Sequence, residues 1–301
     1  GLAALAPLVA RRRGGTEQES PQSLGFLGGM NVSLFSVCLG SRPGSDGFFV
    51  WNDADPRRRP GVFADVPVVG TRSWGVLLTG ARLVHSLFTI DLGCEKGCGA
   101  ILDSGTSLLV VPPAVIDQVS RAVESLNADC SNLHVLPTLL FRLGGRDHLL
   151  PPDAYVGDES GPPPAPVQPR LGGGEHLRNP HRCRLLLMET DVQTQFGPMW
   201  VLGMPFFRSY YTTFDLGLDR RRVGRGGAAT AAGAGAVARA GRSVFTARAG
   251  PLCAPEAPAE PPRPPAASLL ALGGGRPAIN TSQVAVSPWV QAAAMEQFVH
   301  I

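Results

Sequence analysis

The sequence predicts an all-β protein, mainly β-strands with one or two short helices, and three observations support this prediction. Apolar runs of roughly four to eight residues recur through residues 19–225, with turn residues between them. Glycine and proline are abundant, at 37 and 28 of the 301 residues, as expected for strands joined by many turns. One stretch, residues 112–129, places its apolar residues at helical spacing instead.

The expected strands follow one another along the chain and are bounded by Gly, Pro, Asn, Asp and Ser. They are residues 35–40, 47–51, 65–70, 74–84, 87–93, 100–105, 107–112, 139–145, 148–156, 184–190, 200–207 and 210–217. Short strands at this spacing are typical of a β-sandwich or a β-barrel.

Residues 112–129 are predicted to form an amphipathic helix between two of these strands. Its apolar side chains recur at intervals of three or four residues, at Val115, Val119, Ala122, Val123 and Leu126. Pro113 suits the first turn of a helix, where the missing N–H of proline has no helical partner to lose.

The chain is expected to have three parts. Residues 1–18 form a loop-rich lead-in, and residues 19–225 form the structured body, with a loop insertion at residues 157–179. Residues 226–301 contain low-complexity tracts of Ala, Gly, Pro and Arg. Such tracts bury too little apolar surface to offset the entropy of ordering, so we expect this tail to be disordered.

The charge pattern argues against a nucleic-acid partner. The net charge is only +3, and the arginines occur in short separate runs at residues 11–13, 57–59 and 220–222. We interpret these runs as solvated loops. No apolar stretch reaches the roughly 18 residues of a membrane span, and we find no signal segment at the start of the sequence.

Two of the six cysteines bracket a tight loop, CEKGC. The spacing of Cys94 and Cys98 fits either a small disulfide loop or one half of a zinc site. No second close pair of Cys or His follows, which favours the disulfide, and we predict neither a metal nor a cofactor. Cys130 and Cys183 are candidates for a second, longer disulfide-closed loop.

Disulfides indicate an oxidising compartment. Two N-glycosylation sequons, Asn31-Val-Ser33 and Asn280-Thr-Ser282, fit that setting, although such triplets are weak patterns.

The segment AILDSGTSLLVVP, residues 100–112, contains a carboxylate between two apolar strands. Burying a lone carboxylate costs free energy unless the group is paired or hydrogen-bonded. The hydroxyls of the Ser-Gly-Thr-Ser sequence that follows Asp103, together with backbone N–H groups, are candidates for those hydrogen bonds. Asp-Ser-Gly alone is common in turns, so the apolar flanks are what favour a functional carboxylate.

This segment resembles the hydrophobic-Asp-Thr/Ser-Gly-Thr-Ser motif in the C-terminal lobe of pepsin-like aspartic proteases. Other family landmarks occur in the same order: GCEKGC before the Asp, a helix after it, then LPTLLFRLGGRDHLLPPDAYV and GPMWVLGMPFFRSYYTTFDLG. LFSVCLG and WGVLLTGARL look like the strands that join the two lobes and open the second. The resemblance covers about residues 20–225 and implies the C-terminal lobe of a bilobal pepsin-like acid protease fold.

The resemblance implies an aspartic-type endopeptidase, in which one aspartate from each lobe shares a proton and activates a water molecule. Asp103 would be the catalytic aspartate of the C-terminal lobe. Ser104 would hydrogen-bond across to the opposite lobe, Gly105 would let the backbone approach the dyad, and Thr106 would bond the outer carboxylate oxygen. The Val201-Leu202-Gly203 element would brace this loop from below.

Aromatic residues in the matching segments are expected to be core residues and not to contact the substrate. They are Trp200, Phe206, Phe207, Tyr210 and Tyr211. Tyr155 is expected at the end of a strand with its hydroxyl satisfied. We assign no role to the histidines, because their spacing does not indicate a ligand set.

The sequence departs from the family pattern in several places. Residues 1–99 contain no second Asp-Thr/Ser-Gly motif and no flap tyrosine. GLAALAP at residues 1–7 resembles the end of the N-terminal lobe, so we expect the rest of that lobe upstream and this chain alone to be inactive. Met204 stands where the family has Asp or Asn. After Gly224 the closing strand is replaced by Arg-Gly-Gly, so we expect that strand to be incomplete.

Two other functions stay open. A single lobe that forms homodimers would bring two copies of Asp103 together, as in retroviral-type proteases. A non-catalytic, protein-binding relative would keep the fold and lack the first aspartate. Under the endopeptidase hypothesis, the partners are a protein or peptide substrate and an N-terminal lobe in cis. The location would be the secretory pathway, in a lysosome- or vacuole-like compartment or outside the cell.

Overall fold

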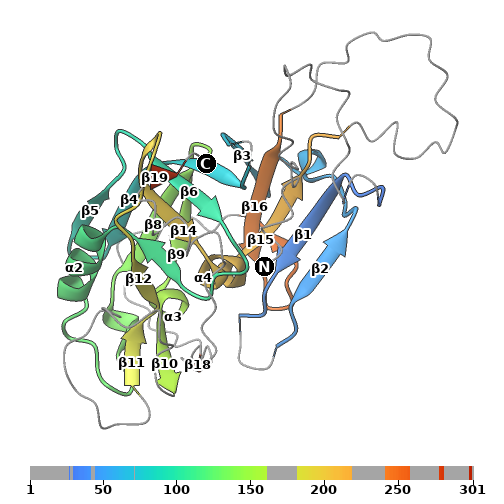
Figure 1. Ribbon diagram of the computed structural model, residues 1–301. Helices are drawn as coiled ribbons and strands as arrows, with labels where there is room; N and C mark the ends of the chain where they lie inside the picture. The colour runs from blue at the N-terminus through green and yellow to red at the C-terminus, as the bar shows by residue number, and fades with distance from the viewer. Residues whose placement is uncertain are drawn as a thin grey trace, which may run out of the picture.

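The computed structural model consists mainly of β-strands with a few short helices, as predicted, and is shown in Figure 1. It describes residues 27, 30–41, 45–70, 72–160, 182–218, 241–257, 278–280 and 298–299. Most strands within these ranges belong to two sheets, which we call the larger sheet and the smaller sheet. In Figure 1 the larger sheet lies on the left and the smaller sheet on the right.

The larger sheet has the strand order β12-β7-β14-β6-β4-β8-β9. These strands are β4 (Gly75–Val84), β6 (Cys98–Leu102), β7 (Leu109–Val111), β8 (Thr138–Leu143), β9 (Arg146–Leu150), β12 (Leu187–Glu189) and β14 (Gly197–Leu202). Off this path, β5 (Thr89–Gly93) pairs with β4, and β13 (Gln193–Thr194) pairs with β14 and with β19 (Phe298–Val299).

At the centre of the larger sheet, β14 lies between β6 and β7. It is parallel to β6, with Leu202 opposite Leu102, and antiparallel to β7, with Val201 opposite Val110. The chain must therefore pass from β6 to β7 over the end of β14, and residues 103–108 form that crossing.

The smaller sheet has the order β17-β16-β15-β1-β2, with β3 also paired to β16. Its strands are β1 (Leu34–Cys38), β2 (Phe48–Trp51), β3 (Ala64–Pro67), β15 (Tyr210–Asp215), β16 (Ser243–Ala249) and β17 (Pro255–Glu256). A third, three-stranded sheet contains β10 (Val156–Ser160), β11 (Arg182–Leu185) and β18 (Ala278–Asn280).

The helices within the described ranges are short. They are α2 (Pro113–Ala122), α3 (Pro152–Tyr155), α4 (Met204–Ser209) and the 3-10 turns η2 (Pro56–Arg58) and η3 (Leu133–Val135). None of them has the length and hydrophobicity that a membrane-spanning helix requires. The predicted helix begins as expected, but it ends at Ala122 and does not continue to residue 129.

The two sheets share one main hydrophobic core. Phe35 and Phe214 of the smaller sheet stack at 4.9 Å, and Trp74, which precedes β4, packs against both rings. The prediction that the aromatic residues would be core residues is confirmed, because Trp200, Phe206, Phe207, Tyr210 and Tyr211 are all buried. Tyr155 is also buried, and its hydroxyl donates to the carbonyl of Pro137 at 2.5 Å.

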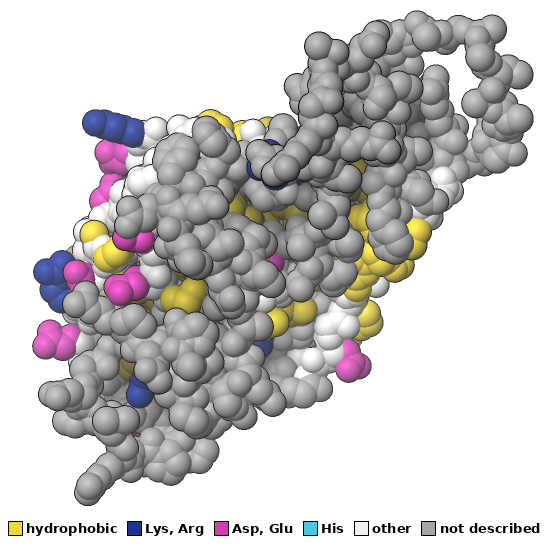
Figure 2. All heavy atoms as spheres, in the orientation of Figure 1, with side chains coloured by type: hydrophobic (Ala, Val, Ile, Leu, Met, Phe, Trp, Pro, Cys, Tyr) yellow, Lys and Arg dark blue, Asp and Glu magenta, His cyan; other side chains and the backbone are white. Residues whose placement is uncertain are grey.

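The outer edge of the smaller sheet is apolar and partly uncovered. Its edge strand, β2, leaves Phe48 50% and Trp51 44% exposed. Figure 2 shows hydrophobic side chains gathered on the side of the molecule where Figure 1 places β1 and β2. An edge strand with unpaired backbone groups and large apolar side chains is a surface suited to pairing with another segment.

Several expectations are corrected by the structure. Residues 148–156 are not one strand, because β9 ends at Leu150 and α3 follows it, so Tyr155 ends a helix and not a strand. Residues 200–207 are not one strand, because β14 ends at Leu202 and α4 begins at Met204, with Pro205 in its first turn. The expected loop insertion begins later than predicted, since residues 157–160 continue β10. The tail is not wholly disordered, since β16 pairs with β15 over six residues.

Strand β16 takes the place of the closing strand that we expected to be incomplete. Its side chains Val244 and Phe245 are buried, so the strand stabilises the smaller sheet despite the low-complexity composition around it. The lead-in at residues 1–18, and most of the remaining tail, lie outside the described residues.

Candidate active site

Asp103 is the first residue of the crossing loop and is fully buried. Its backbone N–H donates to the carbonyl of Leu202 at 3.1 Å, which fixes the start of the loop to the end of β14. Its side-chain Oδ1 accepts the Gly105 N–H at 2.9 Å, and its Oδ2 accepts the Thr106 hydroxyl at 2.7 Å. Both carboxylate oxygens thus accept a hydrogen bond, which offsets the cost of burial.

The loop closes on itself and on the start of α4. The Thr106 N–H donates to the Asp103 carbonyl at 3.2 Å, and the Met204 N–H donates to the Thr106 carbonyl at 2.8 Å. Thr106 is also fully buried. The position of the carboxyl group is therefore set by its own loop and by the β14–α4 junction together.

Gly203 stands at that junction and is required by the space available. A Cβ atom on Gly203 would overlap the carbonyl oxygens of Leu108 and Thr106, which belong to the crossing loop. The backbone φ of Gly203 is −88°, an ordinary value, so the requirement comes from the close approach of the loop and not from the backbone conformation.

The structure therefore brings most of the predicted site residues together. Val201 and Leu202 lie in β14 directly beside β6, Gly203 lies under the loop, and Thr106 holds the carboxyl group. Ser104 and Gly105 are only half-buried, in contrast to Asp103. The role expected for the Ser104 hydroxyl involves a second lobe and stays a prediction.

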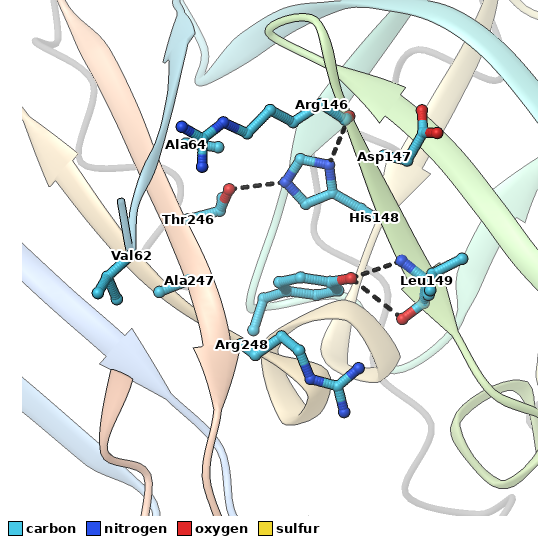
Figure 3. A pocket seen from close by; sticks show the side chains of 10 residues that line it. Val62, Ala64, Arg146, Asp147, His148, Leu149, Thr246, Ala247 and Arg248 are labelled. Carbon is cyan, nitrogen blue, oxygen red and sulfur yellow. Dashed lines mark hydrogen bonds between the residues drawn. The ribbon is translucent and has the colours of Figure 1, made fainter. Parts of the chain in front are cut away.

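A small cavity of about 30 Å³ lies away from these residues, between β9 and β16. Figure 3 shows His148 of β9 in its wall, between the carbonyl of Arg146 and the side chain of Thr246. The ring Nδ1 lies 3.1 Å from the Arg146 carbonyl oxygen and Nε2 lies 2.7 Å from the Thr246 hydroxyl. His148 therefore links the larger sheet to the smaller one.

Burial lowers the pKa of His148 to about 4, because the charged imidazolium loses its hydration there. The hydrogen bond to the Arg146 carbonyl opposes this effect but does not cancel it. We expected no role for this histidine, because its spacing in the sequence indicates no ligand set.

The six cysteines form three disulfides, and none is free. Cys94–Cys98 and Cys130–Cys183 are present as expected. The third, Cys38–Cys253, joins the end of β1 to the segment after β16 and was not predicted. Cysteine connectivity is not readable from a sequence alone, and Cys253 lies in the segment that we expected to be disordered. Within the described ranges, no three His, Cys, Asp or Glu side chains are grouped as metal ligands would be.

Comparison with known proteins identifies a family that matches most of this chain. Residues 26–226 match the family described as eukaryotic aspartyl protease. The chain is similar to cathepsin E from Rattus norvegicus, with 30% identity over 62% of this chain and 44% of the relative. It is also similar to cathepsin D from Clupea harengus, at 31% identity over 64% of this chain and 45% of the relative.

A third relative, gastricsin from Cavia porcellus, is 33% identical over 64% of this chain and 45% of its own length. The chain thus spans less than half the length of these curated relatives. The matched region contains the whole of the crossing loop and the β14–α4 junction. On this match, and with a mainly-β lobe as its structure, the chain belongs to the eukaryotic aspartyl protease family.

Proposed function

We propose that this chain supplies the second catalytic aspartate of an aspartic endopeptidase, and that this aspartate is Asp103. The observation that carries the proposal is the buried Asp103 carboxyl group, held by the Gly105 N–H and the Thr106 hydroxyl within a loop fixed to β14. A fully buried carboxyl with both oxygens bonded inside its own loop is pre-oriented, as a catalytic group must be.

The proposed chemistry needs a second carboxyl group facing Asp103. One carboxylate removes a proton from a water molecule as the water oxygen adds to the carbonyl carbon of the scissile peptide bond. The other, protonated carboxyl donates its proton to the carbonyl oxygen. The C–N bond then breaks as the leaving nitrogen takes up the proton that the first carboxyl group removed from water, while one hydroxyl of the diol intermediate returns its proton to the second carboxyl group. A single carboxylate does not serve as base and acid in the same step, so we expect this chain alone to be inactive.

The neighbouring residues have supporting roles in this proposal. Thr106 holds one carboxylate oxygen, and Gly105 presents its N–H to the other. Ser104 is assigned the hydrogen bond to the loop that faces it from the second lobe. The Val201-Leu202-Gly203 segment supports the loop from below, because Gly203 leaves room for it to cross β14.

We propose that an N-terminal lobe of the same polypeptide supplies the other carboxyl group. The relatives are more than twice as long as the regions that match this chain, which leaves room for such a lobe. The apolar edge at β2, with Phe48 and Trp51 exposed, is a surface that such a lobe would cover. The remaining partner is a protein or peptide substrate.

We further propose that the protein enters the secretory pathway. All six cysteines are paired in disulfides, which form and persist in oxidising compartments. An acidic compartment or an acidic exterior suits the chemistry, because the carboxyl pair must hold one proton between its two members.

The first test is the transcript sequence upstream of the codon for Gly1. An in-frame apolar-Asp-Thr/Ser-Gly motif would give Asp103 its partner. The intact polypeptide is then assayed for peptide hydrolysis at acid pH, with and without a statine-type transition-state mimic. Asp103→Asn is expected to reduce the rate by at least about 10³-fold, which is within the range attributed to a positioned proton-transfer group.

The matched control is Asp117→Asn, which changes an exposed aspartate on α2 in the same way and is expected to leave the rate unchanged. Hydrolysis that survives Asp103→Asn would contradict the proposed role of Asp103. An upstream sequence without the motif would favour the homodimer or the non-catalytic relative.

A further inference from the structure

We propose that Asn31 is an N-glycosylation site, modified before the chain folds. Asn31, Val32 and Ser33 form an acceptor triplet for oligosaccharide transfer, and the middle residue is not proline. The proposal rests on the secretory route proposed above and does not depend on peptidase activity.

The folded chain leaves the Asn31 side chain exposed. Asn31 lies in the turn before β1, with φ at 64°, a left-handed conformation that asparagine tolerates better than most residues. Its backbone carbonyl accepts the side-chain amide of Asn52 at 3.0 Å. Within the described part of the chain, the side chain of Asn31 itself makes no hydrogen bond. Its Nδ2 therefore has room to carry a large polar group.

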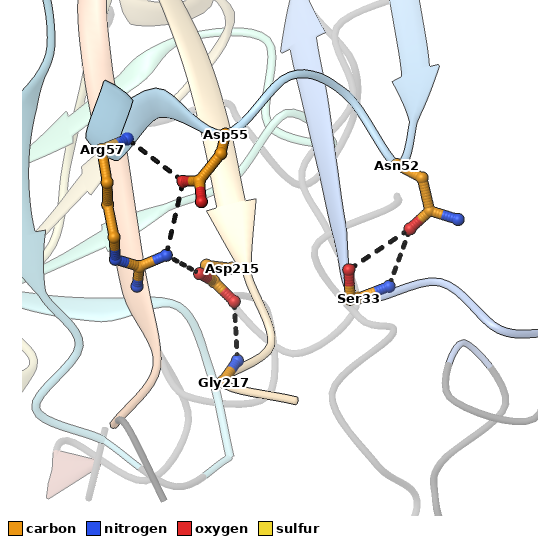
Figure 4. Close-up of polar contacts among 6 residues, drawn as sticks. All are labelled: Ser33, Asn52, Asp55, Arg57, Asp215 and Gly217. Carbon is orange, nitrogen blue, oxygen red and sulfur yellow. Dashed lines mark hydrogen bonds and ion pairs between the residues drawn. The ribbon is translucent and has the colours of Figure 1, made fainter. Parts of the chain in front are cut away.

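The third residue of the triplet, in contrast to Asn31, is buried. Ser33 is 4% exposed. Its N–H donates to the Asn52 Oδ1 at 2.9 Å, and its hydroxyl lies 3.4 Å from the same oxygen (Figure 4). Its carbonyl also accepts the N–H of Leu216, next to β15. An enzyme that reads the whole triplet has no access to Ser33 once β1 is paired.

These two observations together determine the order of events. The acceptor residue is exposed in the fold, so an attached oligosaccharide is compatible with the native structure. The recognition residue, Ser33, is covered by Asn52 and by the smaller sheet, so the oligosaccharide must be transferred to the unfolded chain. The geometry thus points to modification during synthesis and not on the finished protein.

An oligosaccharide on Asn31 would lie far from the candidate active site. Asn31 precedes the first residue of β1, beside the Asp215 end of β15, where Arg57 pairs with Asp215 at 2.5 Å (Figure 4). The opposite end of β1 is the one near α4, because Leu39 donates to the Phe207 carbonyl there. Five strand residues separate the two ends, roughly 17 Å, so the oligosaccharide would leave the crossing loop open.

The chemistry is a group transfer from a polyprenyl-pyrophosphate-linked oligosaccharide. The Asn31 Nδ2 forms a bond to the anomeric carbon of the first sugar, and the bond from that carbon to the pyrophosphate oxygen breaks. The amide nitrogen loses one proton to a base of the transferase, and the lipid pyrophosphate leaves.

The other triplet, at Asn280, serves as an internal comparison. Asn280 ends β18, which pairs in parallel with β10, and its Ser282 lies outside the described residues. We make no proposal for Asn280, but Asn280→Gln removes it from the measurement.

The experiment expresses the full chain behind a secretion signal in cultured eukaryotic cells, with Asn280→Gln as the background. Digestion with an endoglycosidase that releases N-linked oligosaccharides is expected to reduce the mass of this protein. Asn31→Gln and Ser33→Ala are each expected to abolish the change in mass, whereas Ser33→Thr, which keeps the acceptor pattern, is expected to retain it.

A positive control adds Asp129→Thr to the Asn31→Gln variant, which completes an acceptor triplet at the exposed Asn127. An unmodified Asn31 in cells that modify this control would overturn the proposal. A second experiment tests whether modification precedes folding. Protein that has folded without oligosaccharide is mixed with transferase and donor, and it should stay unmodified. The reduced, unfolded chain under the same conditions should be modified. Equal modification of the two forms would contradict the inferred order.

Discussion

Asp103 and His148 both have buried, titratable side chains. The hydrogen bonds described for the Asp103 carboxyl are local, whereas one of the two at the His148 ring reaches a strand far along the chain. Asp103 is 0% exposed and is held by Gly105 and Thr106, two and three residues away. His148 is 1% exposed, and its side-chain partner Thr246 is 98 residues away. The bonds to the Asp103 carboxyl are built into a short motif, whereas the bond between His148 and Thr246 exists only when two sheets pack together.

This difference separates a local site from a tertiary one. The Asp103 loop is hydrogen-bonded to its own carboxyl group and is also bonded to the end of β14. The His148 environment depends on the β9–β16 junction, with Phe206 and Tyr210 packed against the ring at 5.9 Å and 4.9 Å. We therefore expect changes at the loop to act through local fit, and changes at His148 to act through the association of the sheets.

The largest expected effect comes from Gly203→Ala, which tests whether the loop depends on close contact with β14. The added methyl group would overlap the carbonyls of Leu108 and Thr106, so the loop or α4 must move. We expect the free energy of unfolding to fall by about 3 kcal/mol or more, as for other overpacked sites. Urea unfolding at neutral pH measures this change.

The control is Gly61→Ala, where a Cβ atom would have nothing within 4 Å. It is expected to change the free energy of unfolding by less than about 0.5 kcal/mol. Similar small effects for both substitutions would show that the loop does not need the close approach at Gly203.

A smaller effect, about 3 kcal/mol at most, is expected from the protonation of His148. Its pKa is lowered to about 4 in the folded chain, against an ordinary value of 6.5. Between pH 6.5 and pH 4 the unfolded chain binds a proton that the folded chain does not bind. This contribution to stability is therefore complete above pH 6.5 and is lost as the pH falls towards 4.

The charged groups around His148 do not remove this effect. Asp147 is adjacent but pairs with Arg142 at 3.0 Å, while Arg146 on the same strand and Arg248 on β16 both add positive charge near the cavity. Urea unfolding from pH 7.5 to pH 4 should show a steeper loss of stability in the natural chain than in His148→Gln.

The control His134→Gln, which changes an exposed histidine, should lose stability with falling pH as steeply as the natural chain does. Parallel pH profiles for the natural chain and His148→Gln would mean that His148 does not stay neutral in the fold. A steep loss would also mean that the acid conditions proposed for catalysis weaken this lobe.

The same contrast between local and distant partners explains how much of the molecule could be predicted from the sequence. The apolar flanks of Asp103, with hydroxyls within three residues, indicated a buried, hydrogen-bonded carboxyl, and the resemblance to pepsin-like aspartic proteases implied Thr106 as its partner. The small loop at Cys94 and Cys98 was predictable for the same reason. Many strands of the larger sheet were also predictable, because they coincide with alternating or continuous apolar runs, whereas the order in which they pair was not predicted.

The rest depends on contacts that no short pattern encodes. Strand β16 was missed because its sequence, SVFTARA, lies within Ala- and Gly-rich surroundings, and its stability comes from pairing with β15 and β3. Cys38–Cys253 spans 215 residues, so its pairing depends on that same sheet. Residues 204–207, which begin α4, were assigned to a strand because the apolar run from Trp200 shows no clear periodicity, and a short apolar run does not distinguish strand from helix.

The smallest expected effects compare the two hydroxyls that hold the buried groups. Thr106→Val replaces the donor to Asp103 Oδ2 with a methyl group of similar size and leaves that oxygen without this bond. Because the acceptor is a carboxylate, we expect the free energy of unfolding to fall by about 2 kcal/mol at neutral pH. Thr246→Val removes the partner of a neutral imidazole, so we expect a loss of about 1 kcal/mol.

The pH dependence of stability gives a second comparison between the two threonine variants. Thr246→Val should leave the acid-dependent loss of stability at His148 in place, because burial and not the hydroxyl is its main cause. Chemical unfolding of both variants at pH 7 and pH 4.5 measures the two effects together. A greater loss for Thr246→Val than for Thr106→Val would reverse the comparison, because the inter-sheet link would then stabilise the fold more than the carboxyl loop does.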